Sequence, residues 1–310
     1  MKNIIILFTA LFSVISFAQD IIAQDLRVSD YVEGTLLLPN NKTKTVAIII
    51  PGSGPTDRDG NQNFLQSNSL KYLAQDISNA GIATFRYDKR ALTMLKKGAS
   101  EKSINAVRFD DFVEDAKKTV QYLKRRGYEK IYFIGHSQGS LVAMLASHKD
   151  VTGFISIAGA GRTIDEVIME QLAMMLVPKE MMEKAQKTID IMKTGKTDKD
   201  FPPALANVFN LPLQPFMINW MKYSPTEEIK KLTIPTLIIN GTKDFQVSTN
   251  EAALLKNAQP DAEYEIIENM NHALKTVESD DKQENAKTYN MPQLKNTEGL
   301  AQIIIDFIKK

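Results

Sequence analysis

The residues best suited to chemistry in this 310-residue chain surround a serine, in the sequence Gly135-His-Ser-Gln-Gly139. An apolar run typical of a strand, 130–134, precedes them, and a run typical of a helix, 140–146, follows. This context predicts a nucleophile elbow, a sharp strand-to-helix turn that raises the Ser137 hydroxyl above the end of a parallel sheet. Glycine suits both ends of so tight a bend, because a Cβ there would collide with the neighbouring strand or helix. Ser137 is therefore the candidate nucleophile.

A serine nucleophile needs a base, and the chain contains only three histidines. His136 precedes the serine within the same turn, so we expect its side chain to point away from the hydroxyl. His148 lies three turns down the following helix, about 16 Å from the serine. His272, just after the strand-like run 262–267, is the remaining histidine and the predicted base.

The acid that orients this base should lie between the serine and the histidine, at the carboxyl end of a strand. The run 233–240 is such a strand, and Asp244 follows it in a short polar turn. Asp244 is therefore the predicted acid, with turn capping as the alternative role. Asp261 and Glu268 are weaker candidates, since the first precedes the last strand and the second is too close to His272. The order serine, aspartate, histidine is that of neither chymotrypsin-like nor subtilisin-like proteases.

A second glycine-bearing segment, Pro51-Gly-Ser-Gly-Pro-Thr-Asp-Arg-Asp-Gly60, follows the strand-like run 45–50. It lacks the Gly-Lys-Ser/Thr of a phosphate-binding loop and the third glycine of a dinucleotide fingerprint. Its acidic residues also lack the spacing of a calcium-binding loop. We expect Asp57, Arg58 and Asp59 to form ion pairs and caps that hold the loop rigid. Three scattered histidines and no cysteine give no reason to expect a metal site.

These motifs resemble those of bacterial α/β-hydrolases of the esterase and serine-aminopeptidase-like group. The similarity is strongest to carboxylesterases that carry the loop Gly-Ser-Gly-Pro-Thr-Asp-Arg-Asp-Gly, here residues 52–60. Those enzymes usually continue, after the next strand, with Arg-Tyr-Asp-Lys-Arg-Gly. Residues 86–90 match this segment, and Ala91 replaces its glycine. The resemblance covers most of 30–310 and is weakest over 162–225.

The resemblance implies a mechanism and a pair of oxyanion-hole donors. In α/β-hydrolases the residue after the nucleophile, here Gln138, gives one backbone N–H. The second comes from the X of a His-Gly-X sequence, which Pro51-Gly52-Ser53 matches, so that Ser53 is the expected donor. The implied activity is hydrolysis of small carboxylic esters, with short-to-medium acyl, aryl or acetyl groups, through an acyl-enzyme and without a cofactor.

Other functions are compatible with the same three residues. An aminopeptidase would need acidic side chains to hold the substrate's ammonium group, and Glu166 and Glu170 are the obvious candidates. An acyltransferase would need a pocket that favours an acceptor alcohol over water. A non-catalytic binding protein on this scaffold is disfavoured, because the serine, aspartate and histidine are all present.

Strands and helices alternate along the chain, which predicts a mostly parallel, doubly wound sheet with helices on both faces. The strands are expected at 32–38, 45–50, 82–87, 130–135, 152–158, 234–240 and 263–267, and the helices at 66–80, 109–127, 139–148, 249–258 and 297–309. Residues 162–225 break this alternation and hold eight of the thirteen methionines. We expect them to form a helical cap on a hydrolase core of residues 19–161 and 226–310. The methionines either fill the interior of that cap or line a pocket over the serine.

The first eighteen residues have the pattern of a Sec signal peptide. Lys2 precedes an apolar run, 4–15, and Ser16-Phe-Ala18 forms a small-x-small cleavage pattern. The run is shorter than the roughly 20 residues of a membrane span, so we expect export to the periplasm or the medium without a stable membrane anchor. The absence of cysteine excludes disulfides and thiol catalysis. Since 38 basic residues face 37 acidic ones, no basic surface for nucleic acid is expected either.

Overall fold

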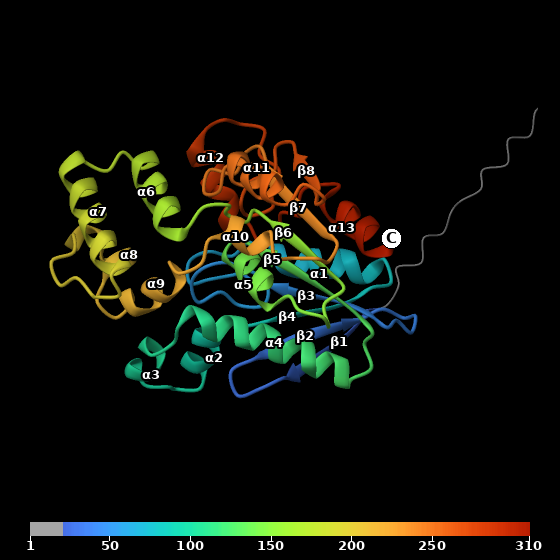
Figure 1. Cartoon of the computed structure of the whole chain (residues 1–310). Helices are drawn as coiled ribbons and strands as arrows, with labels where there is room; N and C mark the ends of the chain where they lie inside the picture. The colour runs from blue at the N-terminus through green and yellow to red at the C-terminus, as the bar shows by residue number, and fades with distance from the viewer. Residues whose placement is uncertain (1–20) are drawn as a thin grey trace, which may run out of the picture.

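Eight strands form one sheet in the order β1-β2-β4-β3-β5-β6-β7-β8 (Figure 1). The computed structural model describes residues 21–310, so the predicted signal peptide lies outside the described residues. β2 pairs antiparallel with β1 and with β4, and every other neighbouring pair is parallel. The strands are β1 (Ile22–Arg27), β2 (Glu33–Leu38), β3 (Thr45–Ile50), β4 (Ala83–Tyr87), β5 (Lys130–His136), β6 (Gly153–Ile157), β7 (Thr236–Gly241) and β8 (Glu263–Ile267).

Helices cover both faces of this sheet, as the alternating pattern predicts. The helices outside the insertion are α1 (Ser69–Asn79), α2 (Arg90–Lys96), α3 (Glu101–Asn105), α4 (Phe109–Arg125), α5 (Gln138–Ala146), α11 (Thr249–Ala258), α12 (Lys282–Lys287) and α13 (Leu300–Lys309). In the described part of the chain, no helix is long and apolar enough to cross a bilayer.

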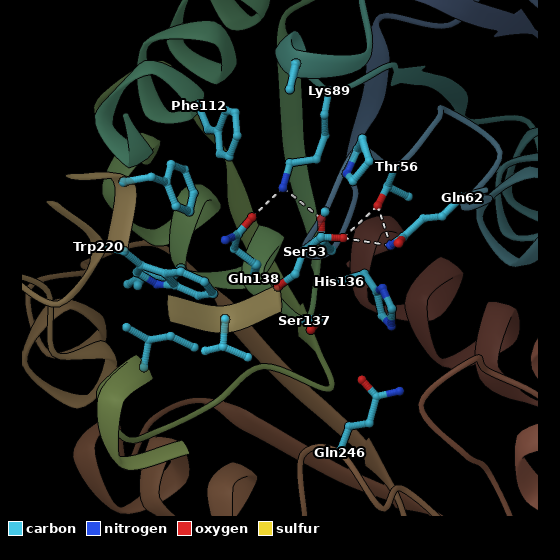
Figure 2. A pocket seen from close by; sticks show the side chains of 18 of the residues that line it. Ser53, Thr56, Gln62, Lys89, Phe112, His136, Ser137, Gln138, Trp220 and Gln246 are labelled. Atoms are coloured by element: carbon cyan, nitrogen blue, oxygen red, sulfur yellow. Dashed lines mark hydrogen bonds between the residues drawn. The ribbon is translucent and has the colours of Figure 1, made fainter. Parts of the chain in front are cut away.

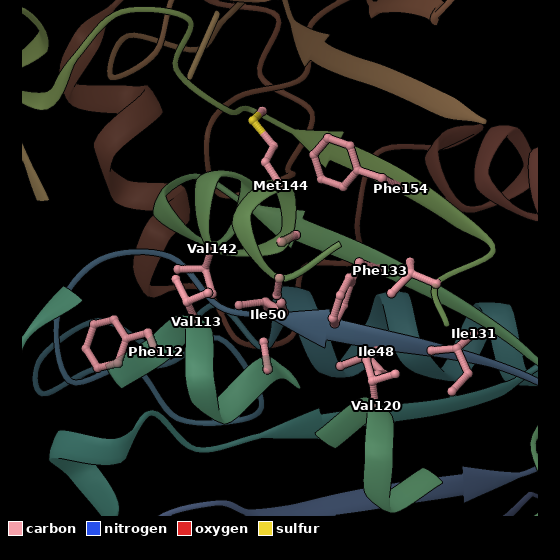
Figure 3. Close-up of a cluster of buried hydrophobic side chains, with 14 of the residues drawn as sticks. Ile48, Ile50, Phe112, Val113, Val120, Ile131, Phe133, Val142, Met144 and Phe154 are labelled. Atoms are coloured by element: carbon pink, nitrogen blue, oxygen red, sulfur yellow. The ribbon is translucent and has the colours of Figure 1, made fainter. Parts of the chain in front are cut away.

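The central strand β3 shows why the sheet is buried on both sides. Val46, Ile48 and Ile50 pack toward α4 and α5, as Figure 3 shows for the two isoleucines. Ala47 and Ile49 belong to the second core, which α1 and α13 cover. An uninterrupted apolar run is what a strand buried on both faces requires, and it made the central strands visible in the sequence.

The strand β1 and three short helices are absent from the sequence prediction. β1 is an edge strand in which Leu26 is the only buried side chain, so it lacks the apolar alternation that signals a strand. The helices α2, α3 and α12 have five to seven residues, shorter than the windows over which helical periodicity is visible. The expected core strands and long helices are all present, with ends that differ by a few residues.

The insertion between β6 and β7 consists of helices around an apolar cluster of its own. The segment between β6 and β7 ends with α10 (Pro225–Ile229), whose buried Ile229 belongs to the core of the sheet. The helices around the separate cluster are α6 (Ile164–Met174), α7 (Lys179–Lys193), α8 (Ala206–Phe209) and α9 (Gln214–Trp220). Leu172, Ile189, Met192 and Phe209 are among the buried side chains of this cluster. In Figure 1, α6 to α9 lie to one side of the sheet, beyond the carboxyl ends of its parallel strands. The cluster gives these helices an interior separate from the two cores of the sheet.

Candidate active site

Ser137 occupies a strained turn between β5 and α5. Its φ of 55° and ψ of −122° lie in a region that non-glycine residues rarely adopt. A Cβ on Gly135 would lie 2.4 Å from the Gly139 carbonyl oxygen, and one on Gly139 would lie 2.3 Å from that of Ile50 in β3. Both glycines therefore have the steric role that the sequence indicates, and the bend aims the Ser137 side chain beyond the sheet.

Asp244 and His272 are brought together at the carboxyl ends of β7 and β8. The His272 Nδ1 lies 2.8 Å from Asp244 Oδ2, and both side chains are buried. The other carboxylate oxygen accepts hydrogen bonds from the backbone N–H groups of Gln246 and Val247, each at 2.9 Å. A carboxylate partner keeps the proton of a neutral imidazole on Nδ1, which leaves Nε2 free to accept one.

Ser137 and His272 line the same pocket, which has a volume of about 820 Å³ (Figure 2). Within residues 21–310 no hydrogen bond links the Ser137 hydroxyl to the imidazole. Such bonds are often long in a site without substrate and shorten when substrate binds. The structure thus places the predicted nucleophile and base at one cavity, and the predicted acid behind the base, in contact with it.

His136 supports the loop that carries His272. Its Nε2–H donates to the backbone carbonyl of His272 at 2.9 Å, and the two imidazole centroids are 4.9 Å apart. Burial, together with the nearby His272, lowers the pKa of His136 to about 4, so His136 is neutral near pH 7. The sequence eliminated this residue as the base and gave no indication of its contact with His272.

The loop after β3 passes close to the nucleophile. A Cβ on Gly52 would lie 3.2 Å from the Ser137 Cβ, so only glycine allows this approach without displacement. Gln138 is the first residue of α5, where backbone N–H groups have no partner within the helix. In the part of the chain that the structure describes, neither the Ser53 N–H nor the Gln138 N–H donates a hydrogen bond. Two free donors therefore border the pocket beside Ser137.

The charged residues of this loop pair with the segment that follows β4. Arg58 bonds to Asp88 through its backbone N–H at 2.8 Å and through its guanidinium at 3.1 Å. Arg86 bonds to Asp59 at 2.9 Å, and Asp57 caps the backbone of the loop itself. Although burial opposes it, hydrogen bonds from Arg58 and from a lysine on α2 lower the pKa of Asp88. The expected network is present, and it extends beyond the loop to the 86–90 segment.

Lys89 is a residue of the site that sequence reasoning missed. Only 4% of it is exposed, and its ammonium donates to the Gly52 carbonyl at 2.8 Å and to the Gln138 side-chain oxygen. The ammonium also lies 4.3 Å from the centroid of the Phe112 ring. Burial lowers the pKa of Lys89 to about 7. The available signal was its place in the 86–90 motif. Ala91, where the motif that residues 86–90 resemble continues with glycine, lies in the first turn of α2, a position that suits alanine.

The insertion contributes apolar side chains to the pocket. Phe216, Met217 and Trp220 of α9 line it, and the Trp220 ring stacks on Phe109 of α4 with centroids 5.3 Å apart. Met175 continues the apolar spacing of α6 but is 76% exposed, because the helix ends one residue before it. All eight methionines of the insertion lie within the described residues, and only Met217 contributes to the lining. Of the two roles that the sequence left open for these methionines, pocket lining applies to Met217, and packing inside the insertion applies to buried members such as Met192.

Acidic side chains do not contribute to the pocket lining within residues 21–310. Glu166 is exposed on α6, and Glu170 pairs with Arg162, which also pairs with the buried Glu251. The described residues contain no group of three or more His, Asp or Glu side chains arranged to hold a metal.

Comparisons with known proteins agree with this architecture. A family model described as serine aminopeptidase, S33, matches residues 65–204. The chain is 27% identical over 247 residues to the esterase EstD of Thermotoga maritima. That alignment covers 78% of this chain and 57% of EstD, so the chain spans little more than half the length of this relative.

Solved structures show the same fold. Est1E from Butyrivibrio proteoclasticus is similar with a TM-score of 0.56 and 16% identity, over 93% of this chain and 99% of Est1E. An acylaminoacyl peptidase from Pyrococcus horikoshii is similar with a TM-score of 0.55 and 15% identity, over 94% of this chain and 42% of the peptidase. Together with the mostly parallel sheet and the serine at its strand-to-helix turn, these likenesses show that the chain has the α/β-hydrolase fold.

Proposed function

We propose that this protein is a serine esterase that hydrolyses carboxylic esters through an acyl-enzyme on Ser137. The observation that carries the proposal is the Asp244–His272 hydrogen bond of 2.8 Å, formed at the wall of the pocket into which the strained elbow projects Ser137. The relationship to the esterase EstD supports ester hydrolysis. The same geometry without a basic imidazole beside the serine would leave the hydroxyl a weak nucleophile.

The reaction runs in two halves. His272 Nε2 accepts the hydroxyl proton as Ser137 Oγ attacks the ester carbonyl, while Asp244 stabilises the imidazolium that forms. The Ser53 and Gln138 N–H groups stabilise the negative oxygen of the tetrahedral intermediate. Collapse of this intermediate expels the alcohol, which takes its proton from His272. A water molecule then attacks the acyl-enzyme by the same route and releases the acid. No step needs a cofactor.

The pocket supports acyl groups of short to medium length, or aryl groups. Its volume of about 820 Å³ exceeds what an acetyl group fills, and Phe112, Phe216 and Trp220 supply an apolar wall. The match to the serine-aminopeptidase family model favours the peptidase alternative, and the positions of the acidic side chains count against it. An aminopeptidase site needs a carboxylate for the substrate's ammonium group. The acidic side chains named for that role, Glu166 and Glu170, lie outside the pocket lining, so esters are the better substrates.

The test is a p-nitrophenyl ester series from acetate to palmitate, assayed beside aminoacyl-p-nitroanilides and with and without EDTA. We expect ester turnover with a preference below the long chains, no effect of EDTA, and no anilide turnover. Ser137→Ala should lower kcat by several orders of magnitude with an unchanged melting temperature. Ser147→Ala, at the other end of α5, is the matched control and should retain activity. Anilide turnover that exceeds ester turnover would reverse the assignment in favour of a peptidase.

We also propose that the enzyme acts after export. The support is the signal-peptide pattern of residues 1–18. Expression of the full chain followed by N-terminal sequencing of the exported protein should give a mature chain that begins at Gln19. Retention of Met1 in an active cytoplasmic enzyme would contradict this proposal.

A further inference from the structure

The ammonium group of Lys89 occupies an unusual position for a lysine. It is buried, and no carboxylate lies within ion-pair distance of it among the described residues. Burial of an unpaired cation is costly, so the groups around it must compensate. Three do so: the Gly52 carbonyl, the Gln138 side-chain oxygen and the face of the Phe112 ring. Figure 2 shows Lys89 reaching down from the 86–90 segment to Gln138 and to the loop that carries Ser53.

Two of these contacts involve the proposed oxyanion hole: one is with Gly52, whose carbonyl belongs to the peptide that carries the Ser53 N–H, and the other is with Gln138 itself. The Gly52 carbonyl and the Ser53 N–H belong to one planar trans peptide, in which they point in opposite directions. A hydrogen bond that fixes the Gly52 oxygen on one side therefore aims the Ser53 N–H to the other. The second acceptor is the side chain of Gln138, whose own backbone N–H is the other donor.

The next peptide of the loop is held as well. The Ser53 carbonyl accepts hydrogen bonds from the Thr56 hydroxyl and from the Gln62 amide, both at 2.8 Å (Figure 2). Glycines at 52 and 54 flank Ser53, and glycine leaves backbone torsions free to rotate. Without a bond on the Gly52 side, the peptide that presents the Ser53 N–H could turn away from the hole. The Lys89 ammonium supplies that bond, and its charge strengthens it.

We propose that Lys89 is a positioning residue that orients both N–H donors of the oxyanion hole, Ser53 through the Gly52 carbonyl and Gln138 through its side chain. The inference rests on the proposed esterase function. It assigns to Lys89, and to no other residue of the 86–90 segment, a part in transition-state stabilisation, because misaimed donors lose most of their effect on the tetrahedral intermediate while substrate binding is preserved.

The first experiment compares Lys89→Met with the wild-type protein. Active-site titration corrects for any unfolded fraction. We expect kcat to fall by about 10- to 100-fold, less than the 10²–10³ of a donor removed outright, with KM nearly unchanged. A trifluoromethyl ketone, which forms a tetrahedral oxyanion adduct with serine, should lose affinity by the same factor, whereas the carboxylic acid product should not. Arg90→Met is the matched control: it removes a neighbouring, partly buried cation that pairs with Asp115 and should lower stability without lowering kcat per titrated site.

The second experiment uses the absence of cysteine from the chain. Lys89→Cys introduces a single thiol, which 2-bromoethylamine converts under denaturing conditions into a lysine isostere that carries the ammonium. After refolding we expect kcat to recover to within a few-fold of wild type, and 1-bromopropane, which gives a neutral side chain of equal length, not to restore it. Equal recovery with both reagents would show that packing and not the ammonium is needed, and would overturn the proposal.

If the Lys89 variants do not fold, Gln138→Met tests the proposal instead. This variant keeps the backbone N–H of residue 138 and removes the side-chain oxygen that accepts from Lys89. It should lose trifluoromethyl ketone affinity, but less than a variant that loses both contacts; an unchanged affinity overturns the link. The wild-type protein and Ser137→Ala are assayed in parallel. A wild-type protein without esterase activity would overturn the proposed function and this proposal with it. Normal wild-type activity beside an unimpaired Lys89→Met would overturn the role of Lys89 alone.

Discussion

Replacement of Asp244 by asparagine tests the proposed acid with almost no change of shape. In the structure, one carboxylate oxygen accepts two backbone hydrogen bonds of 2.9 Å and the other meets His272 Nδ1 at 2.8 Å. Asparagine has one acceptor, and the two backbone donors hold it. Its NH₂ group must then face Nδ1, so that the proton of the imidazole moves to Nε2. In that tautomer His272 cannot accept the proton of Ser137.

The expected loss of kcat follows from the free energy needed to flip the asparagine amide into the orientation that keeps the productive His272 tautomer. Turning the amide over would restore the correct tautomer but leave two buried N–H groups unsatisfied, at about 1–3 kcal/mol each. The wrong tautomer is therefore favoured by about 2–6 kcal/mol, and at 1.36 kcal/mol per factor of ten kcat should fall by about 30-fold to 10⁴-fold. The effect should be smaller than that of His272→Ala.

The assay is hydrolysis of p-nitrophenyl butyrate, with kcat calculated per titrated serine. Asp261→Asn, at an exposed position before β8, is the matched control and should keep full activity. The reasoning is refuted if Asp244→Asn retains more than a tenth of the wild-type kcat, or if Asp261→Asn is the more damaging change.

Three further outcomes are expected. Gly139→Ala places a Cβ 2.3 Å from the Ile50 carbonyl oxygen, so thermal unfolding should show a loss of about 1–3 kcal/mol or more, together with lost activity. The pKa of His136 is about 4 in the folded state against about 6.5 when unfolded, so the unfolded chain binds the proton first as the pH falls. The stability that comes from neutral His136 is therefore complete above pH 6.5, and the free energy of unfolding should fall by on the order of 2–3 kcal/mol toward pH 4. Urea titrations of His136→Gln over this pH range should show a smaller fall. An equal fall in both proteins would disprove His136 as the cause. Trp220→Ala should change the butyrate-to-acetate ratio of kcat/KM by about 1 kcal/mol per methylene-sized change in pocket volume, while Ile134→Ala, in the core, should cost about 2–5 kcal/mol of stability and leave that ratio unaltered.

The sequence predicts those parts of the protein whose signal is local. The strands β3 and β5 are continuous apolar runs because both faces of the sheet are buried, and Gly135 follows from sterics within the turn itself. Asp244 was reached from chain order and from its place just after a predicted strand. The structure adds the 2.8 Å contact with His272 that makes its proposed role testable.

The features that were missed depend on contacts between distant segments. Lys89 stands in a run of charged residues, and nothing in that run shows that α4 and the loop after β3 enclose it. Met175 continues the apolar spacing of α6, yet the helix ends at Met174 and leaves the side chain in solvent. Periodicity describes a helix face but not where the helix stops, and a charge in a motif does not reveal whether it is buried.

The stacked pair of Trp220 and Phe109 also has an optical consequence. Trp220 is the only tryptophan in the chain, and it lies where the insertion meets α4 at the pocket wall. Fluorescence excited at the red edge of the absorption band, where tyrosine does not absorb, therefore originates from this junction alone. The emission maximum and the quenching of this fluorescence report whether the Trp220 ring is stacked on Phe109 or exposed to solvent. The position of the insertion can therefore be followed in the unlabelled protein, in real time, during a single turnover.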